Sequence, residues 1–238
     1  ARYFSTLDLV AGYHQIPLSP RSVEKTAFVT TDGSWEFTVM PMGLRTASAT
    51  FQRAMDIVLS GIKWVSAAVY LDDLLVYTPT FEGHLRDLEQ VFSRLRAAGL
   101  TVKKSKTHLC RLEVPYLGHI VSAKGIAVDP AKVRAVKEMP VPTSQSELRT
   151  ALGLSGYYRR FIRDYARIAA PLFHLLRTGV PFTWGSSQQD AWERIQDILC
   201  SSPVLGHPDW KKNFELSVDA SDKGLGAVLS QGDVVISY

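Results

Sequence analysis

Two adjacent aspartates stand between two apolar runs, and this arrangement restricts the fold more than any other feature of the chain. The runs at 65–71 and 74–77 are rich in Val, Leu and Tyr, which predicts two strands. Because only Asp72 and Asp73 separate them, we expect a hairpin with both carboxylates at its tip. Asp tolerates turn geometry, although Asp-Asp is not the preferred turn pair. Taken alone, such a tip is more often a solvated turn than a functional site.

A third acid changes this interpretation. Residues 2–9 are predicted to form a strand that carries Asp8 near its end, with Phe4 and Thr6 on the same face. Carboxylates placed close together repel one another, and a divalent cation with a preference for hard oxygen ligands, such as Mg²⁺, removes that repulsion. If Asp8 lies beside the hairpin tip, three carboxylates could hold two Mg²⁺ roughly 3.5–4 Å apart, as in-line phosphoryl transfer requires. The residues thus favour a nucleotidyl transferase.

Charge and composition fit a polyanionic partner without requiring one. The chain has 238 residues, of which 46% are hydrophobic and 21% charged, so it is globular rather than disordered. The net charge is only +4, but six Lys or Arg and no acid fall within 91–112, and nine basic against four acidic residues fall within 129–178. Arginines alternate with aromatics at 157–163, which suits contact with a nucleic-acid backbone through Arg159, Arg160 and Arg163. Solvated helix faces are the alternative for each cluster.

The two cysteines argue against a zinc site or a disulfide framework. Cys110 and Cys200 are ninety residues apart with no Cys or His at metal-binding spacing, so we expect two buried free thiols and an intracellular, reducing compartment. No apolar run approaches membrane-spanning length, and no membrane partner is expected. The chain starts at Ala1 and stops in the apolar run 234–238, so we expect a segment of a longer polypeptide.

Further elements follow from periodicity and punctuation. A hairpin is expected around Asp32-Gly33, from strands at 26–30 and 35–39, and a turn at 40–44. Helices are expected at 46–62, at 82–98 with Leu85 facing inward, from a Ser144/Glu147 capping box to about 162, and at 187–199. Near the end, the strand 214–219 is expected to stop at Asp219, and a second strand to begin at residue 224.

Six motifs occur in the order found in reverse transcriptases. They are Phe-Ser-Thr-Leu-Asp-Leu-Val-Ala-Gly-Tyr-His-Gln-Ile at 4–16, Met-Pro-Met-Gly-Leu at 40–44 with Thr-Phe-Gln at 50–52, Tyr-Leu-Asp-Asp at 70–73, Tyr-Leu-Gly-His at 116–119, Tyr-Tyr-Arg-Arg-Phe-Ile at 157–162, and Asp-Ala-Ser at 219–221 with Gly-Leu-Gly-Ala-Val-Leu-Ser-Gln at 224–231. The chain most resembles the Pol polyprotein of gypsy-class LTR retrotransposons, and the resemblance covers nearly its whole length.

The resemblance implies an α+β fold: a right-hand polymerase palm with partial fingers, a helical thumb/connection and a truncated RNase H-like β start. The implied segments are 1–122 for partial fingers and palm, 123–205 for thumb/connection, and 206–238 for the N-terminal part of the RNase H-like domain. The fingers residues that grip a triphosphate, and the further carboxylates that an RNase H site needs, would lie in the rest of the Pol polyprotein, upstream and downstream. RNase H activity is therefore not expected from this chain.

Residue roles follow from the same resemblance. Asp8, Asp72 and Asp73 match the carboxylates that bind two Mg²⁺ (Mn²⁺ is possible), with the Leu9 carbonyl completing one shell. Tyr13 matches the aromatic side chain that excludes a ribose 2′-hydroxyl. Three positions match the turn against the incoming nucleotide, namely Pro41, Met42 and Gly43.

The remaining roles are assigned in the same way. Lys106 is the best match for the lysine that protonates pyrophosphate, and Asp219 resembles the first metal carboxylate of an RNase H fold. Four positions resemble the primer grip, namely Tyr116, Leu117, Gly118 and His119.

These assignments imply an RNA-directed DNA polymerase that adds dNTPs to a DNA primer 3′-OH on an RNA or DNA template. One alternative is a catalytically incomplete or host-adopted relic that acts as a nucleic-acid-binding module. Another is a different palm polymerase, such as an RNA-dependent RNA polymerase, against which Tyr13 argues because an RNA-making enzyme needs a smaller residue there.

Overall fold

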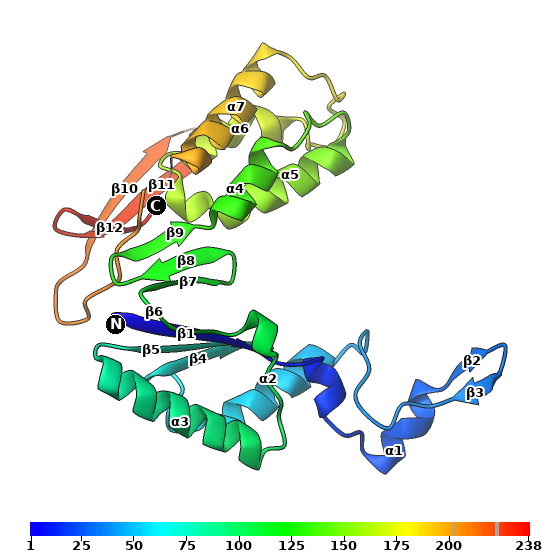
Figure 1. Cartoon of the computed structure of the whole chain (residues 1–238). Helices are drawn as coiled ribbons and strands as arrows, with labels where there is room; N and C mark the ends of the chain where they lie inside the picture. The colour runs from blue at the N-terminus through cyan, green and yellow to red at the C-terminus, as the bar shows by residue number, and fades with distance from the viewer. Residues whose placement is uncertain (202, 222–223) are drawn as a thin grey trace. The chain divides into compact units, whose positions relative to one another are not determined.

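The chain divides into two compact units, residues 1–117 and 118–238 (Figure 1). The computed structural model describes residues 1–201, 203–221 and 224–238, with Ser221 described only in its backbone. Helices and strands both contribute to each unit, so the expected α+β class is confirmed. The division into palm, thumb/connection and RNase H-like segments that the sequence suggests is a division by function, which these compact units do not test. It stays a prediction.

A four-stranded antiparallel sheet forms the centre of the first unit, in the order β4–β5–β1–β6. Its strands are β4 (Ala67–Tyr70), β5 (Asp73–Thr78), β1 (Tyr3–Asp8) and β6 (His108–Arg111). All four residues from Phe4 to Leu7 in β1 are buried. Residues on both faces of β1 are therefore buried, and the strand does not alternate between buried and exposed side chains. This is consistent with its interior place in the sheet.

Two helices cover one face of this sheet: α2 (Ala47–Val58) and α3 (Phe81–Ala97). Phe51 and Met55 of α2 and Leu88 of α3 pack against Leu7 and Leu74 of the sheet in one apolar cluster. The helix expected at 46–62 is therefore present, although it ends at Val58. In α3, Leu85 is 48% exposed and His84 is buried, so the expected inward position of Leu85 is wrong by one residue.

His84 is held in a buried chain of hydrogen bonds. Its Nδ1 lies 2.9 Å from Thr78 Oγ1, and its Nε2 lies 2.7 Å from Ser5 Oγ. The Thr78 hydroxyl donates to the Thr80 carbonyl and so accepts from Nδ1–H, which leaves Nε2 to accept from Ser5. Ser5 Oγ in turn accepts the Cys110 N–H at 2.9 Å. These contacts require a neutral imidazole, and burial lowers the pKa of His84.

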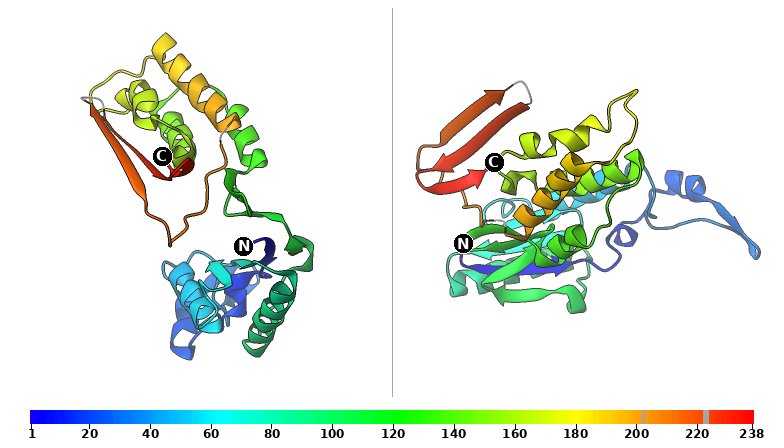
Figure 2. Two further views of the ribbon diagram at one scale, coloured as in Figure 1. Left: turned by 90° about the vertical axis from the view of Figure 1, so that its left-hand side faces the viewer. Right: turned by 90° about the horizontal axis from the view of Figure 1, so that it is seen from above.

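The second hairpin of the first unit, β2 (Phe28–Thr30) with β3 (Gly33–Trp35), is exposed and projects from the sheet (Figures 1 and 2). Thr30 pairs with Gly33, so the predicted Asp32-Gly33 hairpin is present. The expected strand at 35–39 is wrong, because β3 ends at Trp35. Residues 38–40 bond back to 16–18 instead, through Leu18 N–H to Thr38 O and Met40 N–H to Ile16 O. Four short elements complete this unit: η1 (Gly12–Gln15), α1 (Pro20–Val23), η2 (Glu24–Thr26) and η3 (Lys104–Lys106), with β7 (Glu113–Tyr116) at its end.

The second unit begins with the hairpin of β8 (His119–Ser122) and β9 (Gly125–Val128) and continues in helices. These are α4 (Pro130–Lys137), α5 (Gln145–Tyr157), η4 (Arg159–Phe161), α6 (Tyr165–His174) and α7 (Ser186–Cys200). The predicted cap of α5 is present in half: Ser144 Oγ accepts from Glu147 N–H, but the Glu147 carboxylate accepts from Thr143 rather than Ser144. Trp192, Leu148 and Phe161 lie in its buried core.

An antiparallel sheet of β10 (Glu215–Ser221), β11 (Gly224–Gln231) and β12 (Val234–Ser237) ends the second unit. The strand expected to stop at Asp219 continues to Ser221, and the residues between β10 and β11 lie outside the described residues. Neither cysteine is fully buried as predicted: Cys200 is exposed at the end of α7, and Cys110 is half-buried. Among the residues described, no helix is both long and apolar enough to cross a membrane.

Candidate functional site

The Asp72-Asp73 hairpin exists, but its tip lies one residue earlier than predicted. Tyr70 of β4 pairs with Asp73 of β5, so the two-residue turn is Leu71-Asp72 and Asp73 is the first residue of a strand. Leu71 adopts a left-handed backbone conformation with a φ of 54°. A two-residue hairpin turn needs such conformations, and they are unfavourable for a residue with a branched side chain. Something outside the turn must therefore hold it.

The ladder brings Asp8 opposite Asp73. β1 and β5 pair from Tyr3↔Thr78 to Asp8↔Asp73. The Asp8 carbonyl accepts from Lys103 N–H at 2.7 Å, on the side of β1 away from β5. In β5, Tyr77 N–H donates to the Ser66 carbonyl on the β4 side, and Asp73, four residues earlier, directs its backbone groups to the same side. Asp8 and Asp73 are therefore a non-hydrogen-bonded pair, in which side chains lie closest together. Like charges directly opposite are destabilising in such a pair.

The charges at this strand end respond to one another. Loss of contact with water raises the pKa of Asp73, and the like charges of Asp72 and Asp8 raise it further. Lys106 offsets part of this effect, since its Nζ lies 2.9 Å from Asp8 Oδ2 and its own pKa is raised by that bond. The predicted proton donor is thus the cation of the acidic cluster.

The Leu9 carbonyl faces the same cluster by the geometry of the strand. Asp8 and Val10 direct their backbone groups to Lys103 and Thr101 on one side. Because successive residues of a strand direct their backbone groups to alternate sides, the Leu9 carbonyl points to the β5 side. The Gln15 side chain fixes this end of β1, because it accepts from Thr101 N–H at 2.7 Å and donates to the Val10 carbonyl at 2.6 Å.

Tyr13 stands next to the acids and is locked by α2. Its hydroxyl lies 2.9 Å from Ser48 Oγ, and its ring packs edge-on against Phe51 with centroids 5.4 Å apart. Gly12 allows this approach: a Cβ there would lie 2.9 Å from Phe51 Cζ and 3.4 Å from Asp72 Cβ. Tyr13, the turn at Asp72 and the start of α2 therefore form one packed group.

The turn predicted to lie against a nucleotide is anchored beside Tyr13. Pro41 is buried, whereas Met42 is 67% exposed and Gly43 has a φ of 90°. The hydrogen bond from Met40 N–H to Ile16 O ties the turn to the segment after η1. Met42 and Gly43 thus present an open surface supported by a buried residue.

The Tyr-Leu-Gly-His motif at 116–119 contributes residues to both units. In the first, Tyr116 Oη lies 3.5 Å from the Asp73 carbonyl, and burial together with the charge of Asp73 raises the pKa of Tyr116. In the second, His119 stacks on Tyr157 with centroids 5.3 Å apart, and Tyr158 donates to the Gly118 carbonyl at 3.0 Å. Gly118 and His119 therefore pack against the motif at 157–162 within the second unit.

The three arginines predicted to contact nucleic acid have different environments. Arg160 is half-buried, with its Nη2 3.5 Å from the Ile236 carbonyl of β12. Arg159 and Arg163 are exposed and line a cavity of about 580 Å³ with Arg167 and Asp219. Asp219 lies opposite Gly226 in the β10–β11 ladder. Contact between these arginines and nucleic acid stays a prediction.

Sequence reasoning missed two residues that position the site. Gln52 of α2 accepts from Leu71 N–H in the turn, and Gln15 clamps the end of β1. Both lie within the motifs at 4–16 and 50–52, and neither has a side chain that suggests catalysis. Across the described part of the chain, no group of three His, Cys, Asp or Glu residues forms a ready-made metal site.

Comparison with known proteins identifies the class. A family model for "Reverse transcriptase (RNA-dependent DNA polymerase)" matches residues 1–121, and one for "RNase H-like domain found in reverse transcriptase" matches residues 184–236. The chain belongs to the reverse transcriptase family, which confirms the resemblance drawn from the motifs.

Particular relatives agree with this assignment. The chain is 42% identical to the retrovirus-related Pol polyprotein from transposon opus and 41% identical to that from transposon gypsy, both of Drosophila melanogaster. These matches cover 98% and 97% of this chain but 24% of each polyprotein, so the chain spans about a quarter of their length.

Solved structures show the same likeness. The foamy viral protease-reverse transcriptase dRH in complex with double-stranded DNA superposes with a TM-score of 0.91 at 28% identity, over the whole of this chain and 42% of that one. The foamy viral protease-reverse transcriptase in complex with an RNA/DNA hybrid gives a TM-score of 0.89 at 28% identity, over the whole of this chain and 33% of that one. The expected polymerase fold is therefore confirmed.

Proposed function

We propose that the protein carrying this chain is an RNA-directed DNA polymerase that adds dNTPs to a primer 3′-OH. The observation that carries the proposal is the pairing of Asp8 directly opposite Asp73, with Asp72 in the adjoining turn. Two like charges in a non-hydrogen-bonded pair cost stability without a cation, so the fold maintains an arrangement that favours cation binding.

The donor set fits divalent metal. Three carboxylates and the Leu9 carbonyl are hard oxygen donors of the kind that Mg²⁺ prefers, with Mn²⁺ as a substitute. Burial and the like charges of Asp72 and Asp8 raise the pKa of Asp73, and a bound cation would relieve that repulsion. Two bound Mg²⁺ would supply Lewis-acid activation of the 3′-hydroxyl and neutralise charge on the triphosphate. Lys106 occupies Oδ2 of Asp8, which leaves Oδ1 as the oxygen that could serve as a ligand.

The chain's own residues would handle the substrate around this site. Lys106, an ammonium at the edge of the carboxylates, is suited to give a proton to the leaving pyrophosphate. Tyr13, fixed by Ser48 and Phe51, would clash with a 2′-hydroxyl and so select dNTPs. Pro41, Met42 and Gly43 would form the surface under the incoming nucleotide and the template base.

Primer and template would be held by more distant residues. The foamy viral relatives were solved in complex with double-stranded DNA and with an RNA/DNA hybrid, which supports a duplex as the partner here. Tyr116 to His119 would act as the primer grip, and Arg159, Arg160 and Arg163 would contact phosphates. Asp219 would contribute the first metal carboxylate of the RNase H-like part, together with residues in the rest of the Pol polyprotein.

Template-directed primer extension tests the proposal. The protein carrying this chain is incubated with a labelled DNA primer on an RNA template, all four dNTPs and MgCl₂. We expect extension that EDTA abolishes and Mg²⁺ restores, with DNA templates also accepted. A protein that binds the primer–template but never extends it would refute the polymerase assignment and leave a nucleic-acid-binding role.

A further inference from the structure

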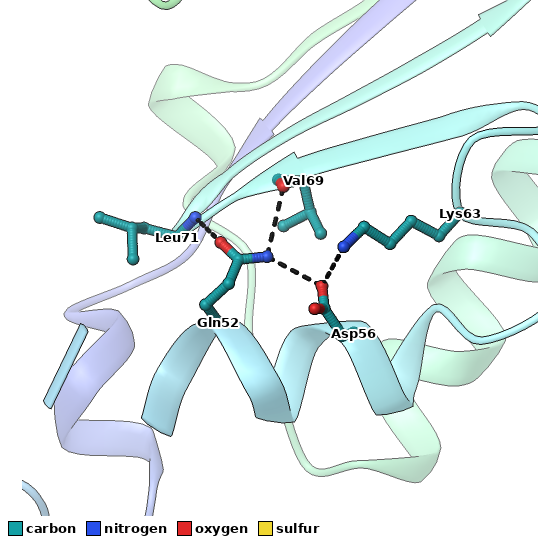
Figure 3. Close-up of polar contacts among 5 residues, drawn as sticks. All are labelled: Gln52, Asp56, Lys63, Val69 and Leu71. Carbon is teal, nitrogen blue, oxygen red and sulfur yellow. Dashed lines mark hydrogen bonds and ion pairs between the residues drawn. The ribbon is translucent and has the colours of Figure 1, made fainter. Parts of the chain in front are cut away.

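We infer that Gln52 is a positioning residue for the catalytic hairpin, and that the Asp56–Lys63 ion pair holds Gln52 in place. Figure 3 shows Gln52 and Asp56 rising from α2 towards the strand above it, with Gln52 nearest Leu71 and Lys63 on the far side of Asp56. Gln52 Oε1 accepts from Leu71 N–H at 2.8 Å, and Gln52 Nε2 donates to Asp56 Oδ1 at 2.9 Å and towards the Val69 carbonyl at 3.4 Å. Helix α2 is thereby bonded to the end of β4 and to the first residue of the turn.

Only one orientation of the Gln52 amide satisfies all of its partners. Leu71 N–H is a donor and needs the carbonyl oxygen, whereas the Val69 carbonyl and the Asp56 carboxylate are acceptors and need the NH₂ group. A flipped amide would place a donor against the Leu71 N–H, and an acceptor against the Val69 carbonyl and the Asp56 carboxylate. The side chain therefore binds the backbone of the strand end and the turn together, and it fixes them relative to α2.

The ion pair behind Gln52 sets this orientation. Asp56 accepts from both Gln52 and Lys63, and these bonds lower the pKa of its carboxyl group, so Asp56 stays an acceptor at neutral pH. Lys63 is 20% exposed, and its backbone forms a bridge with Ala67 at the start of β4. The contacts thus run from the start of β4, through Asp56 and Gln52 of α2, to the turn that follows the end of β4 (Figure 3).

The turn needs an outside anchor for a conformational reason. Leu71 has a left-handed backbone, which its Cβ disfavours, and the next two residues are the like-charged Asp72 and Asp73. The hydrogen bond to Leu71 N–H opposes relaxation of this turn. The neighbouring Phe51 and Ser48 of the same helix hold Tyr13. Helix α2 therefore sets the carboxylates and the sugar-contacting tyrosine relative to one another.

Amide hydrogen exchange tests the anchor without reference to activity. In the 238-residue chain, Gln52→Met keeps the length of the side chain and removes the acceptor, so the Leu71 amide should exchange about fivefold faster or more. The matched control is Gln196→Met in α7, where Gln196 Nε2 donates to the Val136 carbonyl at 2.9 Å and the same substitution should leave Leu71 unchanged. Equal Leu71 exchange in all three proteins would overturn the inference.

The functional consequence rests on the proposed polymerase activity and is measured separately. In the protein carrying this chain, Gln52→Met should lower kcat about 10- to 100-fold and weaken Mn²⁺ binding measured by electron paramagnetic resonance, while the KM for dNTP changes little. Leu71→Gly removes the conformational strain, so Gln52→Met should cost less activity in that background than in the parent. Lys63→Met should give a smaller defect of the same kind.

The outcomes separate the two claims. If the parent protein does not extend primers but the Leu71 amide responds to Gln52→Met, the polymerase assignment fails and the anchor stands. If the parent extends and Gln52→Met matches it in kcat and in Mn²⁺ affinity, the positioning role is refuted. A loss of kcat that Leu71→Gly does not reduce would indicate that Gln52 acts in some way other than by holding the turn.

Discussion

Gly12 provides the most exacting test of how the site is packed. A Cβ at this position would lie 2.9 Å from Phe51 Cζ, against an ordinary contact of 3.4–4 Å. Phe51 is fully buried and its ring already packs on Tyr13, so it has little room to withdraw. Gly12→Ala should therefore act as an overpacking mutation of the core rather than as a backbone mutation.

The magnitude follows from two opposing effects. Overpacking of a well-packed core costs about 1–3 kcal/mol. Replacing Gly by Ala recovers about 0.4–1 kcal/mol through the entropy of the unfolded chain. The net loss of about 1–2 kcal/mol in the free energy of unfolding corresponds to a Tm lower by about 2–8 °C. Because Phe51 and Tyr13 must move, discrimination against rNTPs should also weaken.

The assay pairs two glycine variants. Gly153 lies in α5, and a Cβ added there would meet no atom within 4 Å. Gly153→Ala should therefore stabilise the chain by about 0.5–1 kcal/mol through helix propensity alone, and so raise the Tm. Thermal unfolding of both variants, and incorporation of dCTP against CTP by Gly12→Ala, give the result. If Gly12→Ala is as stable and as selective as the parent, the packing of Gly12 against Phe51 is not what fixes Tyr13.

Three further predictions concern individual side chains. Tyr13→Ala should admit rNTPs in primer extension, and unchanged sugar selectivity would remove the gate assignment. Lys106→Met should lower kcat about 100-fold or more through loss of proton donation. It should also enlarge the rise in Tm on adding Mg²⁺, because the carboxylates lose their internal cation. An unchanged rise in Tm would count against Lys106 as the cation of the acidic cluster. The lowered pKa of His84 means that the folded state resists a proton that the unfolded state takes up. Its contribution to stability is therefore complete above about pH 6.5 and is lost as the pH falls below it, by at most about 1.4 kcal/mol per pH unit. Urea unfolding should accordingly show a shallower pH dependence for His84→Phe than for the parent between pH 7 and 5, and parallel curves would contradict the assignment.

The sequence predicts the elements of the fold better than their register. Apolar periodicity correctly indicates α2, α3 and both strands of the hairpin that carries Asp72 and Asp73, because these patterns depend on local burial. Periodicity misplaces the hairpin tip by one residue, because the pairing of Asp73 with Tyr70 of β4 and with Asp8 of β1 depends on the register of three strands. It also places Leu85 inward in α3, where the buried hydrogen bonds of His84 determine the rotation of the helix.

The candidate site shows a similar division. Asp8, Asp72 and Asp73 are recognisable from residue type and motif order, and the strand ladder brings Asp8 and Asp73 together. Gln52 is not recognisable as part of the site, because its role depends on a bond to backbone nineteen residues away. A polar side chain on the half-buried face of a helix carries no sequence signal for the partner it will find.

Single-nucleotide incorporation by Asp72→Asn tests the central claim most directly. The substitution keeps the shape of the side chain and removes one of the three charges that the proposed metal site requires. Asp233→Asn, in the exposed turn between β11 and β12, serves as the control. With a DNA primer on an RNA template and Mg²⁺, we expect Asp72→Asn to abolish incorporation and Asp233→Asn to match the parent. Incorporation by Asp72→Asn at the parental rate would show that the carboxylates beside β1 are not the catalytic site.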